Sequence, residues 1–197
     1  MNGKTRRKLK RGLVVLLTAI LLNSTVSAAT FPDVDADADY AAAIECVQSV
    51  GIMSGYGDGT FQPNKAVSRA ELASVLCRML GEGDGLASNS RRFTDVPTTH
   101  WANGVVAKAV ELGLVSGYGN GKFGPDDPVT YEQALTMAVN MLGLGDEAGE
   151  AGGYPDGYIN VSEKRGFTDG LSGSKGAAMK RWQIAVLCYN VMMRGGL

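Results

Sequence analysis

Two arginines stand where a helix is predicted to begin, and they are the residues best suited to binding chemistry in this sequence. Arg69 follows the predicted cap Ser68, and Arg181 has the matching position in a related segment. A cation there opposes the positive end of the helix dipole, so local stability does not require it. Free backbone N–H groups and an adjacent guanidinium together suit a carboxylate. We therefore predict that both arginines bind an anion, with a solvated or ion-paired arginine as the alternative.

Two glycine-rich loops offer a second kind of binding chemistry, because glycine lets the backbone approach a ligand closely. The first loop spans residues 54–61 and the second spans residues 116–123. Their tyrosines, Tyr56 and Tyr118, have apolar ring faces on which a sugar can stack. The loop tips are predicted to contact a ligand, although the same residues also suit a tight turn. The tip residues are Gly57, Asp58, Gly59, Gly119, Asn120 and Gly121.

The remaining polar patterns do not support catalysis or metal binding. Alternating aspartates from Asp33 to Asp39 resemble a calcium loop, but Ala38 and Ile44 stand where that loop needs its glycine and its glutamate. His100 is the only histidine, and no serine or cysteine motif accompanies it. We therefore predict no catalytic residue, no metal site and no cofactor.

Several apolar or weakly polar residues have core packing as their better explanation. Cys46, Cys77 and Cys188 fall within apolar helical patterns and lack metal-binding spacing. They are predicted to be unpaired core residues, with one disulfide plus a free thiol as the alternative. Phe61 and Trp101 are also predicted to pack in the core.

An internal repeat with a period of 62 residues organises the chain. Phe31-Pro-Asp-Val34 recurs as Phe93-Thr-Asp-Val96, and the same offset relates the two glycine loops without a gap. A third, degenerate copy follows, in which Arg181-Trp-Gln183 stands in the register of Arg69-Ala-Glu71. The second copy has Tyr131 at the arginine position, which leaves at most two arginine sites but keeps a ring for sugar contact. Residues 81–90 and 143–153 are rich in glycine and acidic residues and are predicted to be linkers.

Apolar residues within each copy recur at helical spacing, so each repeat is predicted to be a helix, a loop and a second helix. Capping pairs mark the start of the second helix, Ser68 with Glu71 and Thr130 with Gln133. Lys180 gives the third copy no side-chain acceptor at its cap. Because one short helix pair cannot bury its own apolar face, the three copies are predicted to pack as one unit.

The first residues predict export. Six lysines and arginines precede the apolar run 13–22, and Val26-Ser27-Ala28 has the small residues that a signal peptidase reads. We predict cleavage after Ala28, with an uncleaved N-terminal anchor as the alternative. Removing the six basic residues leaves 13 basic against 20 acidic residues, a net charge of −7. An acidic chain is not suited to nucleic acid, and no membrane span is expected after cleavage.

The order of these motifs resembles the S-layer homology domain. The motif runs from Phe-x-Asp-Val through the glycine loop to Val-Ser-Arg-Ala-Glu, strongly over 31–80 and 93–142 and weakly over 154–194. The resemblance implies an all-α fold in which three helix-loop-helix repeats pack with pseudo-threefold symmetry after a signal peptide. The implied boundaries are 1–28 for the signal peptide and 29–90, 91–153 and 154–197 for the repeats.

The resemblance also implies a function. Repeats of this family hold proteins non-covalently to the bacterial envelope by binding a secondary cell-wall polysaccharide attached to peptidoglycan, commonly one with pyruvate ketals. The ligand is implied to lie in grooves between repeats, where the motif arginine contacts the acidic sugar. Arg69 and Arg181 match that arginine, and Tyr131 departs from it. We therefore expect a secreted, non-enzymatic anchor at the cell wall or S-layer, with a structural or protein-interaction role in the envelope as the alternative.

Overall fold

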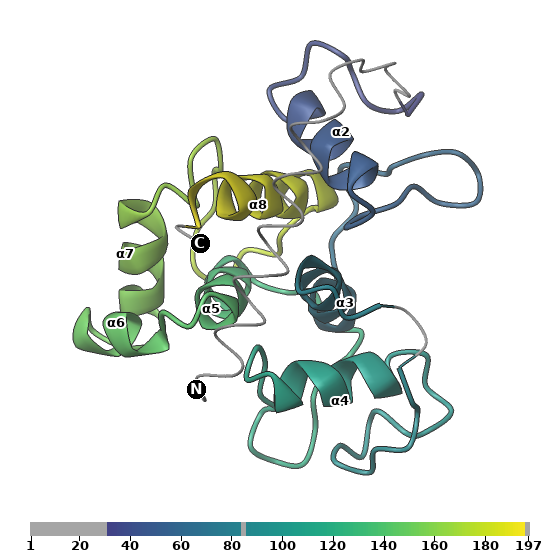
Figure 1. The fold of residues 1–197 in the computed structure, drawn as a ribbon, viewed down its shortest axis with the longest axis vertical. Coiled ribbons are helices and arrows are strands. Elements are labelled where there is room, and N and C mark those ends of the chain that lie inside the picture. The colour runs from purple at the N-terminus through teal and green to yellow at the C-terminus, as the bar shows by residue number, and fades with distance from the viewer. Residues whose placement is uncertain (1–30, 84–85, 196–197) are drawn as a thin grey trace.

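The computed structural model describes residues 31–83 and 86–195, and every regular element in these ranges is an α-helix (Figure 1). The predicted signal peptide and its cleavage site lie outside the described residues. The all-α class predicted from the helical periodicity is confirmed. The helices are α2 (Ala41–Ser49), α3 (Arg69–Met79), α4 (Asn103–Glu111), α5 (Tyr131–Met141), α6 (Gly145–Glu150), α7 (Asp156–Lys164) and α8 (Arg181–Arg194).

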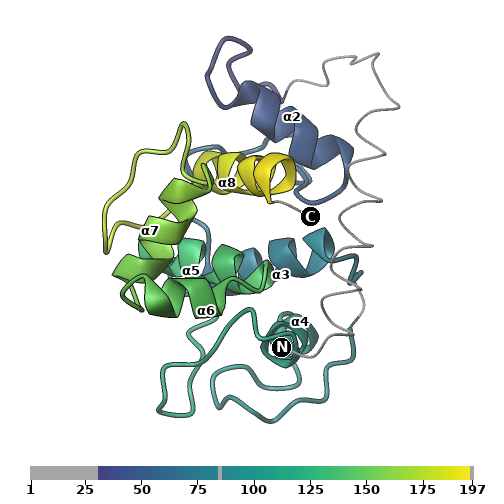
Figure 2. The ribbon, with the colours of Figure 1, turned by 60° about the vertical axis from the view of Figure 1, so that its left-hand side comes forward.

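Helices pack in pairs that join one repeat to the next. α3 packs on α4, α5 packs on α7, and α2 packs on α8 (Figures 1 and 2). In each pair, the second helix of one repeat contacts the first helix of the following repeat. The α2–α8 pair returns from the C-terminal end of the described chain to its first repeat, so the arrangement closes on itself.

A ring of backbone hydrogen bonds lies where the three repeats meet. The segments that lead into α3, α5 and α8 bond to one another in a cycle. Val67 N donates to Met179 O at 3.0 Å, Met179 N donates to Val129 O at 2.9 Å, and Val129 N donates to Val67 O at 2.8 Å. The first residue of each helix adds a second cycle in the opposite sense, since the N–H groups of Arg69, Tyr131 and Arg181 donate to Asp127, Ala177 and Lys65, each at 2.9 Å. The predicted pseudo-threefold unit is therefore present in the backbone.

The caps of the three central helices differ as their residues require. Ser68 Oγ accepts from Glu71 N at 3.2 Å and Glu71 Oε2 accepts from Ser68 N at 2.7 Å, so the predicted capping box is complete. Thr130 makes the return bond, a long 3.4 Å contact from its N–H to Gln133 Oε1, but its hydroxyl makes no side-chain cap bond. An ammonium cannot accept a hydrogen bond, so the side chain of Lys180 cannot cap α8. Only the backbone N–H of Lys180 contributes to the cap, by donating to Gln183 Oε1 at 2.8 Å.

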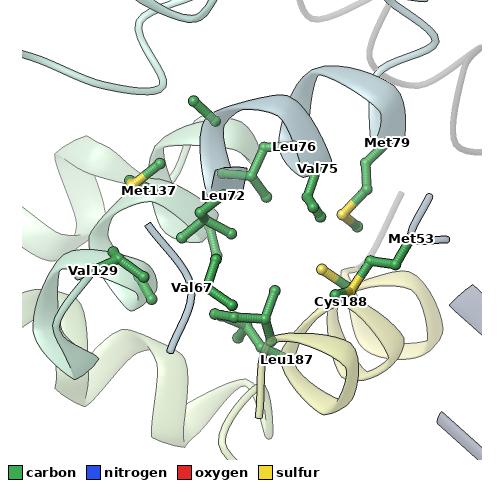
Figure 3. Packing of buried hydrophobic residues seen from close by; sticks show 14 of the residues in the cluster. Met53, Val67, Leu72, Val75, Leu76, Met79, Val129, Met137, Leu187 and Cys188 are labelled. Carbon is green, nitrogen blue, oxygen red and sulfur yellow. The ribbon is translucent and has the colours of Figure 1, made fainter. Parts of the chain in front are cut away.

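The interior of the unit is filled by side chains from all three repeats, as Figure 3 shows for part of the cluster. Phe61 is fully buried, as predicted, and so is its counterpart Phe123. The prediction for Trp101 was wrong, because its side chain is 58% exposed. α4 begins at Asn103, so Trp101 lies in the turn ahead of the helix and stacks on His100 instead of sharing the apolar stripe.

The three cysteines are unpaired, as predicted. Cys77 and Cys188 are buried, whereas Cys46 is half-buried. One predicted linker also differs from expectation, because part of residues 143–153 forms α6. Leu144 and Ala148 pack there against α5 and α7, and this small apolar contact gives the glycine-rich segment a reason to be helical.

Candidate functional site

The side chain of Arg69 leaves its own helix and enters the glycine loop of the second repeat. Its Nε donates to the carbonyl oxygen of Phe123 at 3.0 Å, and its Nη2 donates to that of Ser116 at 3.0 Å. Its Nη1 donates to Gln133 Oε1 at 3.2 Å. Arg69 is only 6% exposed, and these partners are carbonyl and amide oxygens. The arginine is thus a tie between two repeats, and we call this contact the Arg69 junction.

Aromatic rings enclose the Arg69 guanidinium. Its Cζ lies 4.7 Å from the ring centroid of Tyr118 and 4.8 Å from that of Phe123, within the range of a cation–π contact. Burial lowers the pKa of Arg69 from its usual value, but an arginine keeps its charge at neutral pH. The junction therefore holds a permanent cation just beneath the surface.

Arg181 repeats this arrangement between the third repeat and the first. Its Nε donates to Phe61 O at 2.7 Å and its Nη2 donates to Ser54 O at 2.8 Å. Its Cζ lies 4.6 Å from the ring centroid of Tyr56 and 4.5 Å from that of Phe61. Burial lowers the pKa of Arg181 as well. We call this contact the Arg181 junction, and its match to the Arg69 junction bears out the register read from the sequence.

Tyr131 closes the third contact, between the second repeat and the third, without a cation. Its ring lies against Gly173, where an added Cβ atom would stand 2.3 Å from Tyr131 Cδ2. Gly173 lies eight residues before Arg181, just as Phe61 lies eight residues before Arg69. The tyrosine ring therefore occupies the space that a phenylalanine fills in the other two loops. Tyr131 is 7% exposed, and in this structure its ring serves packing.

A groove of about 250 Å³ opens beside the Arg69 guanidinium. One wall is the loop 114–118, and the other is the face of α5 that carries Gln133, Thr136 and Asn140. Tyr154 stands at the rim, and its side chain is 59% exposed. The groove thus combines a cation, neutral hydrogen-bonding side chains and exposed aromatic surface.

The predicted loop-tip residues do not line this groove, which reaches only as far along the loop as Gly117 and Tyr118. Residues 57–59 and 119–121 are exposed. Asp58 Oδ1 accepts from Thr60 N at 2.9 Å, and Asn120 Oδ1 accepts from Lys122 N at 3.1 Å. The polar tip side chains thus have roles in the turn itself, and the structure separates them from the arginines.

Sequence reasoning missed several residues that build the junctions. Gln133 was assigned only to capping, and Tyr154 was noted only as the start of a degenerate repeat. Asp33 was considered only as part of the alternating aspartates, but its carboxylate accepts from Phe61 N at 2.8 Å and from Gln62 N at 2.7 Å, across 28 and 29 residues. Asp95 holds Phe123 N in the same way at 2.9 Å. The repeat contained a signal for these contacts, because Asp33 precedes Phe61 by 28 residues and Asp95 precedes Phe123 by the same number.

Neither a metal site nor a membrane-spanning helix is found in the described ranges. No three histidine, cysteine or acidic side chains are grouped there so as to hold a metal ion. His100 Nδ1 accepts from Ala102 N at 3.1 Å and so has a structural partner. None of the helices from α2 to α8 is long and apolar enough to cross a membrane.

Comparison with known proteins identifies the two strong repeats. The S-layer homology domain matches residues 30–73 and 92–135. Each match includes a Phe-x-Asp-Val motif, a glycine loop and the start of the helix that carries Arg69 or Tyr131.

Curated relatives match over more of the chain. A cell surface protein of Thermoanaerobacter kivui is 36% identical over 92% of this chain and 24% of its own length. A middle cell wall protein of Brevibacillus brevis is 30% identical over 85% of this chain and 16% of its own length. A cellulosome-anchoring protein of Acetivibrio thermocellus is 32% identical over 46% of this chain and 21% of its own length. The chain therefore spans about a quarter or less of these relatives.

Proposed function

Because this chain belongs to the S-layer homology family, we propose that it anchors at the bacterial cell wall by binding an acidic wall polysaccharide at the junctions between its repeats. Family membership and the surface-protein relatives indicate a location at the cell surface, as the sequence predicted. They also support a role in cell-surface anchoring. The identity of the ligand, and the residues that bind it, belong to the proposal.

The groove beside Arg69 is the observation that carries this proposal. A sugar needs a concave surface with an apolar wall for its ring and polar groups for its hydroxyls. The groove offers the exposed rings of Tyr118 and Tyr154, together with the side chains of Gln133 and Asn140. The buried guanidiniums of Arg69 and Arg181 are fixed charges at junctions of reduced solvent screening, and they favour a polysaccharide with acidic substituents such as pyruvate ketals.

The residues from 154 onward are proposed to form the third repeat of the anchor. They supply Arg181 to the first repeat and receive Tyr131 from the second. Without them the backbone ring at Val67, Val129 and Met179 would be open. The unit that binds is therefore proposed to be the closed arrangement of three repeats.

Co-sedimentation with polysaccharide-bearing wall sacculi from the same organism tests the proposal. The purified protein is expected to sediment with intact sacculi and to stay in solution once the polysaccharide is removed. Tyr154→Ala should weaken the interaction, since this exposed ring lines the groove without supporting the core. Met193→Ala is the matched control, because that apolar side chain is 42% exposed on α8 and does not line the groove.

Arg69→Ala and Arg181→Ala together should also weaken binding, but circular dichroism must first show that the variant remains folded. A protein that does not sediment with intact sacculi would overturn the anchor and favour a protein-interaction role in the envelope. Equal binding before and after removal of the polysaccharide would overturn the ligand.

A further inference from the structure

Two equivalent positions of the first two repeats carry opposite charges. Lys65 and Asp127 are separated by the repeat period of 62 residues, and each is bonded to the tyrosine of its own glycine loop. Lys65 Nζ donates to the hydroxyl oxygen of Tyr56 at 2.8 Å. The Tyr118 hydroxyl donates to Asp127 Oδ2 at 2.9 Å. The geometry is conserved between the two sites, while the sign of the charge is reversed.

Because the first repeat has Lys65 where the second has Asp127, two cations, Lys65 and Arg181, lie at the Arg181 junction. Lys65 Nζ lies 4.6 Å from the centroid of the Tyr56 ring, and Arg181 Cζ lies at the same distance from that ring. The Lys65 side chain is 45% exposed, so its ammonium faces solvent beside the buried guanidinium. At the Arg69 junction, the corresponding exposed group is a carboxylate.

The charged groups that act on each arginine also differ between the two sites. Asp33 and Asp95 are equivalent, and each is bonded to backbone N–H groups of its glycine loop. Glu71 Oε1 lies 3.8 Å from Lys65 Nζ, and its counterpart in the second repeat is the neutral Gln133. Arg181 thus has the cation Lys65 beside it together with the carboxylates of Asp33 and Glu71. The charged groups that act most strongly on Arg69 are the carboxylates of Asp127 and Asp95.

The wall of the Arg69 groove suits an uncharged ligand. The Arg69 groove presents two exposed aromatic rings, 48% exposed at Tyr118 and 59% at Tyr154. Apart from Arg69, its hydrogen-bonding side chains are uncharged, among them Gln133 and Asn140. Such a surface suits the apolar face and the hydroxyls of a neutral sugar ring, and Asp127 at its edge disfavours a nearby carboxylate.

We propose that the two arginine junctions bind different parts of one polysaccharide: the Arg181 and Lys65 pair takes the acidic substituent, and the Arg69 groove takes an uncharged sugar ring. This inference rests on the proposed function and assigns the chemistry within it. Arg69 then acts mainly through its ties to the glycine loop, while Lys65 determines specificity for the acid.

A pair of small probes separates the two sites. A methyl glycoside that carries a pyruvate ketal and the methyl ester of the same compound differ in the charge of the carboxylate and by one methyl group. Each is titrated into the isotopically labelled protein, and the backbone amide signals of loops 54–61 and 116–123 are followed by NMR. We expect the acid to shift signals of the first loop and the ester to shift signals of the second loop only.

Substitutions that reverse the charge at Lys65 or at Asp127 then test whether Lys65 determines the binding of the acid. Lys65→Asp should weaken binding of the acid about three- to tenfold, as expected for charge pairs at a partly exposed site. Asp127→Lys should bring binding of the acid to loop 116–123. Lys164→Asp is the control, because it makes the same change of charge on an ammonium that is 77% exposed on α7, and it should leave the affinity unchanged.

The outcomes separate this assignment from the proposed function. If the sacculi bind but the acid shifts loop 116–123 first, or if Lys65→Asp binds the acid as well as Lys164→Asp does, the assignment is overturned and the anchor stands. If the acid, the ester and the sacculi all fail to bind, both proposals are overturned.

Discussion

The Nε atom of Arg181 donates a 2.7 Å hydrogen bond to the carbonyl oxygen of Phe61, which lies 120 residues earlier in the chain. This bond ties the helix of the last repeat to the loop of the first. Arg69 makes the equivalent bond to Phe123, so the arginines hold together the same surfaces at which we propose that the ligand binds. Stability and binding are therefore linked at these two residues.

Arg181→Ala should destabilise the protein, because it leaves the carbonyl oxygens of Phe61 and Ser54 without their charged donor. We expect the free energy of unfolding to fall by about 2–3 kcal/mol, and by a similar amount for Arg69→Ala. Urea denaturation followed by circular dichroism measures this loss. Lys164→Ala removes an exposed cation and should change the stability by less than about 0.5 kcal/mol. A loss below that limit in the arginine variants would contradict the structural role.

The sequence was sufficient for the repeat and for the placement of both arginines at helix starts, but α6 lies in a segment that was predicted to be a linker. Repeat spacing and capping residues are local signals, and they located Ser68 and its helix correctly. The direction of each arginine side chain was not predictable in this way. A pattern within one repeat says nothing of its neighbour, and Arg69 finds its acceptors in a loop more than 40 residues away.

The departure at Tyr131 shows the same limit. Viewed alone, it is a lost arginine, and a tyrosine can be interpreted as a platform for sugar. The role of Tyr131 becomes clear only beside Gly173. This glycine stands where the other two loops have a phenylalanine, and the Tyr131 ring fills the space that is left. The prediction that Trp101 packs in the core failed for a different reason. The apolar spacing extends on the N-terminal side of α4, into the turn that contains Trp101.

The pairing of Tyr131 with Gly173 predicts coupled effects of substitution. Gly173→Phe alone should be strongly destabilising, since even a Cβ atom there would overlap the tyrosine ring. Tyr131→Arg alone should leave a cavity beside the glycine and cost about 2–4 kcal/mol. The double variant should be clearly less destabilised than the sum of the two, because it rebuilds the arginine and phenylalanine pair of the other junctions. Urea unfolding of all four proteins gives the coupling energy, and strict additivity would contradict this explanation.

The cysteines should react with a thiol reagent in a fixed order. Burial raises the pKa of Cys77 to about 12 and that of Cys188 to about 12, so neither forms the reactive thiolate at neutral pH. Burial and the nearby Glu45 also raise the pKa of Cys46, but this side chain is only half-buried. Under native conditions, we expect mass spectrometry to show labelling at Cys46 first. Cys77 and Cys188 should be labelled only as the protein unfolds in urea, and early labelling of either would contradict their burial.

Asp95 should make stability depend on pH in the acid range. Partial burial raises the pKa of its carboxyl, but the hydrogen bonds from Phe123 N and Gly124 N outweigh this effect and hold the pKa below its usual value. A group whose pKa is lowered by folding contributes its stability above the pKa of the unfolded chain, about 4, and that contribution is lost as the pH falls through the folded pKa.

Asp95→Asn should therefore be less stable than the parent protein at pH 7, by about 1–3 kcal/mol, since an amide offers only one acceptor oxygen and no charge to the two N–H groups. The difference should shrink as the pH is lowered from 5 towards 2, because the parent loses its carboxylate over that range. Asp126→Asn changes an exposed residue just after the glycine loop, so it is the control and should follow the parent at every pH. Urea unfolding at several pH values measures the difference, and a gap that stays constant down to pH 2 would contradict the role of the ionised carboxylate in holding the glycine loop.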